Sequence, residues 1–476
     1  MSSLLIRRSI AACAALVYAI QAVPTASADI TINAANVVRK VPEMYLGTNI
    51  NAHVPTFASK ASDLDFHAAL KAAKVQCVRT LAYPDYRKPD HTVEYFDANV
   101  KAILSCGAKP LLVEYINPGQ AYYREDGVVG TADNPGSPES NLVYMVRHYM
   151  EPPFNLTKQV WEVGNEPDIG VDFKTNAESY CLQFNRVHEA LIKAGLRDNV
   201  VLCGPVISQM YWNRAQNRPP ASDYLETFMN RCSEAVDIVD THTYCTFGAP
   251  QQDELLGLTR IDKCDNRFVV DQANMPGVTY DGMAALLAKM DAISFSRPNV
   301  GIAITEYGAT THRQPITGAL WNLCATQAGL YNPRMRMMNS FVFDSLDDKP
   351  DTISHYGRDK KPNDLYWALW MAGNLRGEEV LKRNVKGNAM SDGRSYLVVG
   401  ATRDKDHLYI EVINRSSSAI VDKMQISGVA VSTDAEAFEM SEKVAPDTSK
   451  PFMAGPAFEY RFPGASATVF KLALEN

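Results

Sequence analysis

The stretch VWEVGNEPDIG, residues 160–170, joins an apolar, strand-like beginning to an abruptly polar end. Its apolar residues are typical of a buried strand, and Asn165, Glu166 and Pro167 then follow in direct succession. Proline has a fixed φ and no backbone N–H group, so it turns the chain away at the end of a strand. The segment therefore predicts a strand whose tip presents a carboxylate.

Seven other apolar runs along the chain predict strands of similar length. With the first, the predicted strands are 45–51, 75–83, 110–117, 160–165, 200–207, 238–245, 300–307 and 338–345. Amphipathic stretches typical of helices lie between them, for instance 64–74, 177–194, 281–294 and 365–375. Alternation of this kind predicts an α/β fold, a (β/α)8 TIM barrel over residues 44–375. Two four-stranded sheets are the alternative, but no Gly/Pro-rich linker divides the series.

The pattern changes after Leu375, where β-rich runs follow one another without helices between them. Examples are SYLVVGATRD, HLYIEVINRS, DKMQISGVAV and ATVFKLAL. This pattern predicts an antiparallel β-sandwich over residues 376–476. The alternating run DITINAANVV lies within residues 29–43, and we expect this N-terminal segment to add a strand to the sandwich.

The composition limits the class of protein and its compartment. A chain of 476 residues that is 46% hydrophobic can bury a large core, and its net charge of −7 argues against a nucleic-acid partner. Residues 1–28 are typical of a signal peptide, with two arginines before an apolar run and a small-residue cleavage pattern. We therefore expect a secreted or periplasmic protein, without a membrane anchor once the signal is removed.

Eight of the nine cysteines follow the predicted signal peptide, and eight cysteines allow 105 disulfide pairings. Cys77, Cys203 and Cys245 lie inside strand-like runs, where buried thiols are an alternative to disulfides. No CxxC pair and no histidines at zinc-binding spacing accompany them. We expect neither a structural metal nor a cofactor.

Polar residues stand at the predicted strand ends, which is where TIM barrels carry their chemistry. They are Asn49, Asn51, Arg79, Glu114, Tyr115, Asn165, Glu166, His242, Tyr244, Glu306, Tyr307 and Asp344. Glu166 ends the fourth strand and Glu306 the seventh, so their carboxyl groups can face each other across the barrel mouth. Hydrolysis of a glycosidic bond needs such a pair, one acid and one attacking carboxylate.

Two short motifs carry a family resemblance. GNEP at the fourth strand and TEYG at the seventh resemble the clan of retaining glycoside hydrolases built on (β/α)8 barrels. The sandwich and the closing FEYRFPGASATVFKL are similar to the α-L-arabinofuranosidase, β-xylosidase and β-glucuronidase-like families. The resemblance covers most of the chain in architecture, but only a few short motifs in residues.

The resemblance implies roles for the strand-tip residues. Glu166 matches the acid/base, Glu306 the nucleophile, and Asn165 the asparagine that hydrogen-bonds the sugar 2-hydroxyl. Arg79 in VRTLAY matches an arginine that keeps the nucleophile ionised. Tyr244 in DTHTYCT matches a tyrosine that hydrogen-bonds the nucleophile.

Other candidate substrate-binding residues rest on weaker signals. His242 lies two residues before Tyr244, on the same side of the strand. Asn51 and Tyr115 stand at strand ends. Many members of the clan have a tryptophan at the end of the eighth strand, whereas FVFDSLDD offers Asp344. Trp212, beside Tyr211, is either a sugar-stacking platform or an exposed loop anchor.

Each of the remaining candidates also has a structural explanation. Arg79 would otherwise form a structural ion pair, Tyr244 would be an ordinary half-buried tyrosine, and His242 a hydrogen-bonded core residue. Glu114 is either a substrate contact or a rim salt bridge. The positive charges of the segment 347–362 are more typical of a solvated loop than of a site for an acidic sugar.

Three functions remain for such a chain. The first is a secreted retaining glycoside hydrolase that acts on an oligo- or polysaccharide. The second is a metal-dependent hydrolase with Glu166, His242 and Glu306 as ligands, although the sequence lacks paired histidines at metal spacing. The third is a carbohydrate-binding protein without catalysis. The sugar, the linkage, endo or exo action and the oligomeric state are left open.

Overall fold

The computed structural model describes the chain in fourteen segments. These are residues 29–50, 64–84, 92–115, 122–131, 136–169, 175–208, 221–247, 282–294, 297–311, 315–343, 362–387, 395–416, 418–442 and 444–475. The predicted signal peptide, residues 1–28, and three candidate site residues, Asn51, Trp212 and Asp344, lie outside the described residues.

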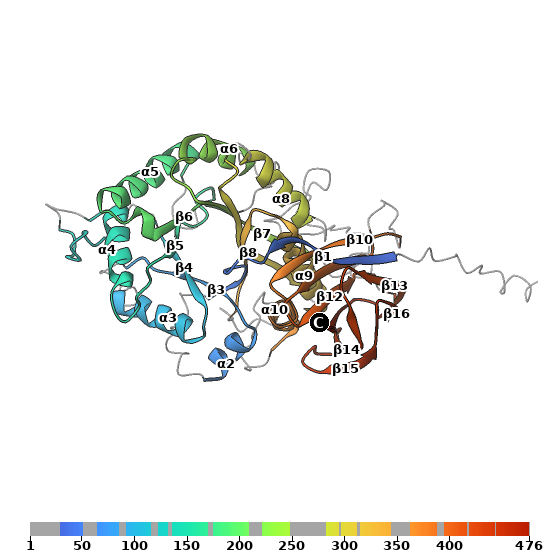
Figure 1. The fold of residues 1–476 in the computed structure, drawn as a ribbon. Coiled ribbons are helices and arrows are strands. Elements are labelled where there is room, and N and C mark those ends of the chain that lie inside the picture. The colour runs from blue at the N-terminus through green and yellow to red at the C-terminus, as the bar shows by residue number, and fades with distance from the viewer. Residues whose placement is uncertain are drawn as a thin grey trace, which may run out of the picture.

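Eight parallel strands close into a barrel, as the sequence predicted (Figure 1). In order they are β2 (Leu46–Asn49), β3 (Cys77–Leu81), β4 (Lys109–Glu114), β5 (Gln159–Val163), β6 (Val200–Ile207), β7 (Ile238–Phe247), β8 (Gly301–Thr311) and β9 (Met335–Ser340). β2 pairs with β9, which closes the ring. The fold class is thereby confirmed.

Helices surround the barrel on its outer face (Figure 1). They are α2 (Leu64–Ala72), α3 (Val93–Ser105), α4 (Pro138–Met150), α5 (Ala177–Lys193), α6 (Ala221–Cys232), α8 (Gly282–Ile293), α9 (Pro315–Tyr331) and α10 (Asp364–Asn374), with a short 3-10 turn at Arg197–Asn199. Side chains cap several helix starts: Ser137 and Ser140 form a capping box on α4, and Asn176 accepts from Ser179 on α5. None of the helices in the described ranges is long and apolar enough to cross a bilayer.

Alternating side chains of the strands fill the barrel. A small apolar cluster made of Cys77, Leu111, Val160, Cys203, Ile238, Ala303 and Met337 occupies one level of the interior. The next inward position along three of these strands is polar: Arg79 on β3, Glu162 on β5 and Asp240 on β7. These polar groups therefore lie between the apolar cluster and the carboxyl ends of the strands.

The eighth barrel strand lies earlier in the sequence than predicted. β9 runs over Met335–Ser340, whereas the apolar pattern predicted residues 338–345. Met335, Met337 and Met338 are buried, but Arg336 between them is exposed, and this charged residue hid the start of the strand in the pattern. Phe341, rather than Asp344, therefore directly follows the strand end.

The second body is a nine-stranded sheet that contains the chain's first described strand. Its order is β15-β14-β17-β12-β11-β10-β1-β13-β16. The strands are β1 (Asp29–Lys40), β10 (Glu379–Val385), β11 (Leu397–Arg403), β12 (His407–Asn414), β13 (Ile420–Ser427), β14 (Val431–Met440), β15 (Ser449–Met453), β16 (Ala457–Phe462) and β17 (Ser466–Leu474).

This sheet folds over on itself to form the predicted sandwich. β15 and β16 stand at opposite ends of the strand order, yet Phe452 and Phe458 pack with ring centroids 5.2 Å apart. β1 enters the sheet as predicted, antiparallel to β10. Its other pairing, with β13, is parallel, so the sheet is mixed and the prediction of a purely antiparallel sandwich was wrong in this respect.

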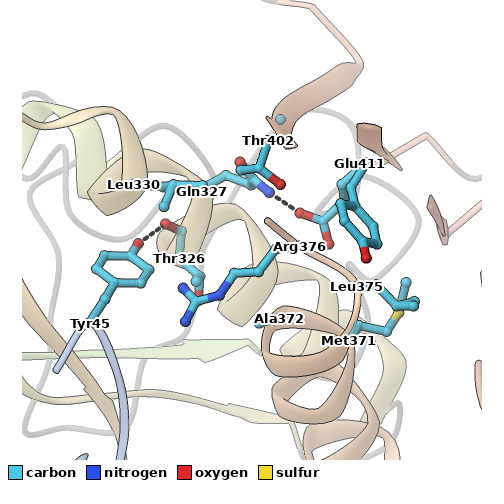
Figure 2. A pocket seen from close by; sticks show the side chains of 12 residues that line it. Tyr45, Thr326, Gln327, Leu330, Met371, Ala372, Leu375, Arg376, Thr402 and Glu411 are labelled. Carbon is cyan, nitrogen blue, oxygen red and sulfur yellow. Dashed lines mark hydrogen bonds between the residues drawn. The ribbon is translucent and has the colours of Figure 1, made fainter. Parts of the chain in front are cut away.

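The barrel and the sandwich meet through α9 and α10 around a small polar cavity (Figure 2). The cavity measures about 20 Å³, enough for one or two water molecules. Gln327 of α9 donates a hydrogen bond to the buried Glu411 of β12. Burial raises the pKa of Glu411 to about 7 and lowers that of Arg376, on the same cavity wall, to about 10.

The described cysteines are free thiols. They are Cys77, Cys106, Cys181, Cys203, Cys232 and Cys324, and all six are buried. The prediction that Cys77 and Cys203 are buried thiols inside strands is therefore confirmed, while the side chain of Cys245 lies outside the described residues.

Candidate active site

The GNEP motif forms a sharp turn that fixes the position of Glu166. β5 ends at Val163, two residues earlier than predicted, and Gly164 has a φ of 90°, a conformation that favours glycine. Gly164 donates its N–H to the carbonyl of Glu114, 2.6 Å away. Gly164 thus makes the turn that the sequence pattern assigned to Pro167, which follows after the carboxylate.

Glu166 itself adopts a left-handed backbone conformation with a φ of 47°. Its N–H donates to the carbonyl of Val206 on β6 at 2.9 Å. Asp168, two residues later, accepts from the N–H and the hydroxyl of Ser208 at 2.9 and 2.7 Å. The loop after β5 is therefore tied to the end of β6 on both sides of Pro167, which holds the Glu166 side chain over the barrel.

Glu306 receives a donor on each carboxylate oxygen. Arg79 donates through Nη1 to Oε1 at 2.6 Å, and the Tyr244 hydroxyl donates to Oε2. Only 9% of the Glu306 side chain is exposed, so both interactions lie in a poorly solvated setting. Two donors aimed at one buried carboxyl group stabilise its negative charge.

Arg79 is the centre of a buried polar network. Its Nη1 also donates to Asn49 at 3.2 Å, its Nη2 to Asn165 at 2.8 Å, and its Nε to Glu162. Burial opposes the positive charge, but Glu162 and Glu306 outweigh it and raise the pKa of Arg79. A planar guanidinium suits this task because its donors diverge in fixed directions.

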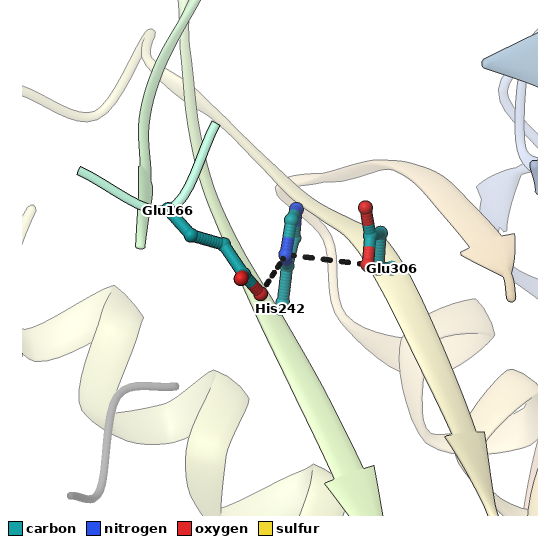
Figure 3. Close-up of side chains that lie close together, drawn as sticks. All are labelled: Glu166, His242 and Glu306. Atoms are coloured by element: carbon teal, nitrogen blue, oxygen red, sulfur yellow. Dashed lines mark hydrogen bonds and ion pairs between the residues drawn. The ribbon is translucent and has the colours of Figure 1, made fainter. Parts of the chain in front are cut away.

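Glu166 and Glu306 face each other across His242, as Figure 3 shows. The His242 Nδ1 atom lies 2.9 Å from Glu166 Oε1 and 3.5 Å from Glu306 Oε2. One oxygen of each glutamate and a ring nitrogen of His242 all lie within 4.8 Å of one another. Burial raises the pKa of Glu166 to about 7, a shift that Arg79 partly opposes.

His242 is fully buried, and burial lowers its pKa although Glu306 pulls in the opposite direction. A neutral imidazole carries one proton, and Nδ1 is the ring nitrogen that faces the two carboxyl groups. Nε2 has no hydrogen-bond partner among the described residues. The geometry therefore favours the Nδ1–H tautomer, which donates to Glu166.

The structure brings together six of the ten predicted site residues at the carboxyl ends of the strands: Glu166, Glu306, Asn165, Arg79, Tyr244 and His242. Tyr115, a seventh, follows β4 and stacks on Tyr83 with centroids 4.2 Å apart, and it also acts electrostatically on Arg79. Asn51, Trp212 and Asp344 lie outside the described residues.

Both readings of Glu114 were wrong. This side chain is fully buried, and both of its oxygens accept from Asn141 Nδ2 at 3.0 Å. Burial raises its pKa well above the usual range. Glu114 is thus neither a rim salt bridge nor exposed to a substrate. Successive side chains of a strand, such as Val113 and Glu114, point to opposite faces, so a position at the strand end does not decide whether a side chain faces the barrel mouth.

Three residues of this site were missed by the sequence reasoning. Glu162 and Asp240 are single carboxylates inside the apolar runs VWEV and IVDT, and this isolation is the signal that would have revealed them. Phe341 is half-buried and meets Tyr244 edge to face, with centroids 5.9 Å apart. It directly follows β9, so it lies at the end of the eighth barrel strand.

Comparison with known proteins finds likeness in structure alone. No protein-family model matches the sequence, and no curated protein does either. Solved structures match over nearly the whole chain. Family 51 α-L-arabinofuranosidase AbfB of Bifidobacterium longum has a TM-score of 0.65 and 15% identity, covering 93% of this chain and 99% of its own.

Two further solved structures show the same relationship. The α-L-arabinofuranosidase of Thermotoga maritima matches with a TM-score of 0.64 and 13% identity, over 94% of this chain and 100% of its own. The family 44 endoglucanase of Clostridium acetobutylium matches with a TM-score of 0.65 and 12% identity, over 94% and 99%. The chain therefore has the barrel-and-sandwich fold that these glycoside hydrolases share.

Proposed function

We propose that this protein is a retaining glycoside hydrolase in which Glu306 is the nucleophile and Glu166 the acid/base. The observation that carries the proposal is the unequal environment of two carboxyl groups with oxygens within 4.8 Å of each other. Retaining enzymes place their carboxyl groups about 5–5.5 Å apart, whereas inverting enzymes need about 6.5–9.5 Å to admit a water molecule.

In the first step, Glu306 attacks the anomeric carbon while Glu166 transfers its proton to the departing glycosidic oxygen. The Glu166 pKa of about 7 suits a group that must be protonated in the free enzyme and lose the proton near neutral pH. Arg79 and Tyr244 each donate to one carboxyl oxygen of Glu306 and hold the group in position until attack. The product of this step is a glycosyl ester of Glu306.

In the second step, ionised Glu166 takes a proton from water, and the resulting hydroxide displaces Glu306 from the sugar. Ester formation removes the negative charge of Glu306 that had countered Arg79. Arg79 already lowers the pKa of Glu166, and this effect grows once its partner is neutral. The same arginine thus favours the ionised form of Glu166 more strongly before the second step, when Glu166 must act as a base, than before the first.

The similar structures support the proposed substrate class. The proteins in these structures are α-L-arabinofuranosidases, an endoglucanase, a xyloglucanase and a bifunctional glucanase-xylanase. We propose a polysaccharide or an oligosaccharide derived from one as the substrate, and no cofactor. We also propose that residues 1–28 direct export and are removed, so that the enzyme acts outside the cytoplasm.

A metal-dependent hydrolase is the second candidate, because Glu166, His242 and Glu306 offer ligand atoms within 4.8 Å of one another. Against it, Arg79 and Tyr244 already occupy both oxygens of Glu306, and a metal ion there would stand close to the guanidinium charge. Dialysis against a chelator separates the two, because a glycosidase of the proposed type keeps its activity.

A panel of chromogenic glycosides tests the proposed function. Hydrolysis of at least one member is expected, and NMR at early times should show that the released sugar keeps its anomeric configuration. Inverted product would exclude Glu306 as nucleophile. Binding of sugars without hydrolysis of any member would favour the third candidate, a carbohydrate-binding protein.

A further inference from the structure

Asp240 is a buried acid for which the proposed mechanism has no direct use. It lies on β7 inside the barrel, with none of its surface exposed, two residues before His242. Glu162 on β5 is equally buried. Arg79 is the cation that the described residues place beside this pair, and it must also serve Glu306.

One oxygen of Asp240 supports the backbone of Glu166. Its Oδ1 accepts from the N–H of Val206 at 2.7 Å, and the carbonyl of Val206 accepts from the N–H of Glu166 at 2.9 Å. Val206 has a φ of 54°, which is unfavourable for a β-branched residue, and Glu166 has a φ of 47°. The Asp240 bond thus holds Val206 in the conformation that fixes Glu166.

The other oxygen of Asp240 connects this residue to Glu306 through Glu162 and Arg79. Asp240 Oδ2 and Glu162 Oε1 are buried, and neither has a donor among the described residues. Both side chains stand one inward position beyond the apolar cluster, Glu162 after Val160 and Asp240 after Ile238, and Glu162 acts on Asp240 as a charge and as a hydrogen-bonding neighbour. Glu162 then accepts from Arg79 Nε through its other oxygen, and Arg79 Nη1 donates to Glu306.

The surroundings of the pair favour one shared proton. The titratable groups that act on Asp240 or are acted on by it are Glu162, Arg79, Cys203 on β6 and Tyr180 on α5. Two ionised carboxylates would face a single guanidinium that is also engaged by Glu306. Burial, and Glu162 after it, raise the pKa of Asp240 well above its usual range.

We propose that Asp240 is a positioning residue that acts as a neutral carboxylic acid. It accepts the N–H of Val206 and donates its proton to Glu162, so that a single side chain fixes both glutamates of the site. Glu166 is held through the backbone of Val206, and Glu306 through Glu162 and Arg79. The inference rests on the proposed function for its catalytic consequence, but not for the protonation of Asp240.

Three variants test the role of Asp240. Asp240→Asn keeps one acceptor for Val206 and one donor for Glu162, so kcat should stay within about threefold of wild type, with the same pH profile. Asp240→Leu keeps the branched shape of the side chain but makes neither bond, so kcat should fall about 30-fold or more, with little change in KM. Glu162→Gln places an amide donor against the proton of Asp240, and it too should lower kcat at least about tenfold.

Other outcomes overturn the proposal. If Asp240→Asn loses as much kcat as Asp240→Leu, Asp240 acts as a charged group. If kcat of Asp240→Leu or Glu162→Gln matches that of wild type, the pair does not position Glu166 and Glu306. Thermal melting of each variant identifies loss of folding. Should Asp240→Leu fail to fold, the contrast between a nearly unchanged kcat in Asp240→Asn and a lowered kcat in Glu162→Gln still decides.

Infrared spectroscopy tests the proton of Asp240 without any substrate. Protein labelled with ¹³C in its aspartate carboxyl groups is compared with labelled Asp240→Asn at pH 8. The wild-type minus variant difference should contain the carbonyl stretch of a protonated carboxyl group, and an ionised carboxylate band in its place would refute the proposal. If the wild type hydrolyses no glycoside, the proposed function fails while this band still reports on Asp240.

Discussion

Arg79 lies 2.6 Å from Glu306 through Nη1, and the same buried guanidinium also reaches Glu162 through Nε. One cation thus neutralises two acids on different sides of the barrel interior. Arg79 contributes hydrogen-bond direction as well as positive charge, since each acid receives its own N–H group. Replacing the guanidinium by an ammonium separates these two contributions.

Arg79→Lys should lower kcat/KM about 10- to 100-fold, which corresponds to about 1.4–2.7 kcal/mol of transition-state stabilisation. Lysine keeps the positive charge but cannot donate at once to Glu162, Glu306 and Asn165. Steady-state kinetics on the best glycoside of the panel measures the effect. Arg197→Lys is the matched control, because Arg197 forms an ion pair with Asp237 away from the site. Equal kcat/KM in wild type and Arg79→Lys would remove Arg79 from the site.

Glu166→Ala should lose activity mainly on substrates with poor leaving groups. The acid is needed most for poor leaving groups, for which kcat should fall about 10²–10⁴-fold, whereas activated aryl glycosides should still form the glycosyl ester. Azide should then attack this ester and yield a glycosyl azide with retained configuration, detectable by NMR. Glu114→Gln, a change at a buried carboxyl outside the site, is the control. A glycosyl azide of retained configuration from Glu306→Ala, and none from Glu166→Ala, would reverse the two assignments, because direct attack by azide in the absence of the nucleophile gives inversion.

The pH profile should have its basic limb at about 7. The Glu166 pKa is raised to about 7 by burial, and the protonated form is the active one in the first step, so kcat/KM should fall as the pH rises through that value. In Glu166→Ala this limb should vanish for substrates with activated leaving groups. A limb that persists in the variant belongs to another group.

Glu411→Gln should change how stability depends on pH. The folded-state pKa of Glu411 is about 7, above the ordinary value for glutamate, so the folded protein holds this proton more tightly. Its contribution to the free energy of unfolding is present below the ordinary glutamate pKa and is lost as the pH rises to about 7, by up to about 3 kcal/mol. Urea unfolding at pH 5 and pH 8 should show a smaller loss in Glu411→Gln than in wild type. Equal losses would show that Glu411 titrates normally.

A chain that ends at Leu375 should not yield a soluble barrel. The truncation exposes the faces of α9 and α10 that now pack against the sandwich, and it leaves β1 without β10 and β13. Expression of residues 29–375 should give aggregated protein, as judged by size-exclusion chromatography. A soluble, fully active barrel would show that the sandwich is dispensable for both folding and chemistry.

The sequence predicted the barrel well because its signals are local. A parallel strand buried on both faces reads as an apolar run, and seven of the eight runs fall close to the strands observed. The eighth failed where Arg336 interrupts the run. The parallel pairing of β1 with β13 could not be predicted at all, since strand direction in a sheet depends on partners nearly 400 residues away.

The positions of site residues at strand ends could be predicted from the sequence. Their protonation states and supporting contacts could not, because these depend on surrounding side chains. Glu166 and Glu306 follow from the motifs and from strand order. The burial that raises the Glu166 pKa, and the link from Asp240 through Val206, depend on side chains from several strands at once. Glu114 shows the converse, because a strand-end carboxylate can turn away from the barrel mouth towards Asn141.

The place of β1 in the middle of the large sheet also constrains the order of events during synthesis. β1 leaves the ribosome first, yet its partners β10 and β13 emerge roughly 350 to 390 residues later. The entropy of closing so long a loop exceeds that of a tenfold shorter one by only about 2 kcal/mol, so the delay is a matter of time more than of energy. Until then this strand lacks both of its partners in the sheet. For the export that we propose, an amino-terminal strand whose partners come last would let the chain enter a narrow channel before its tertiary structure is complete.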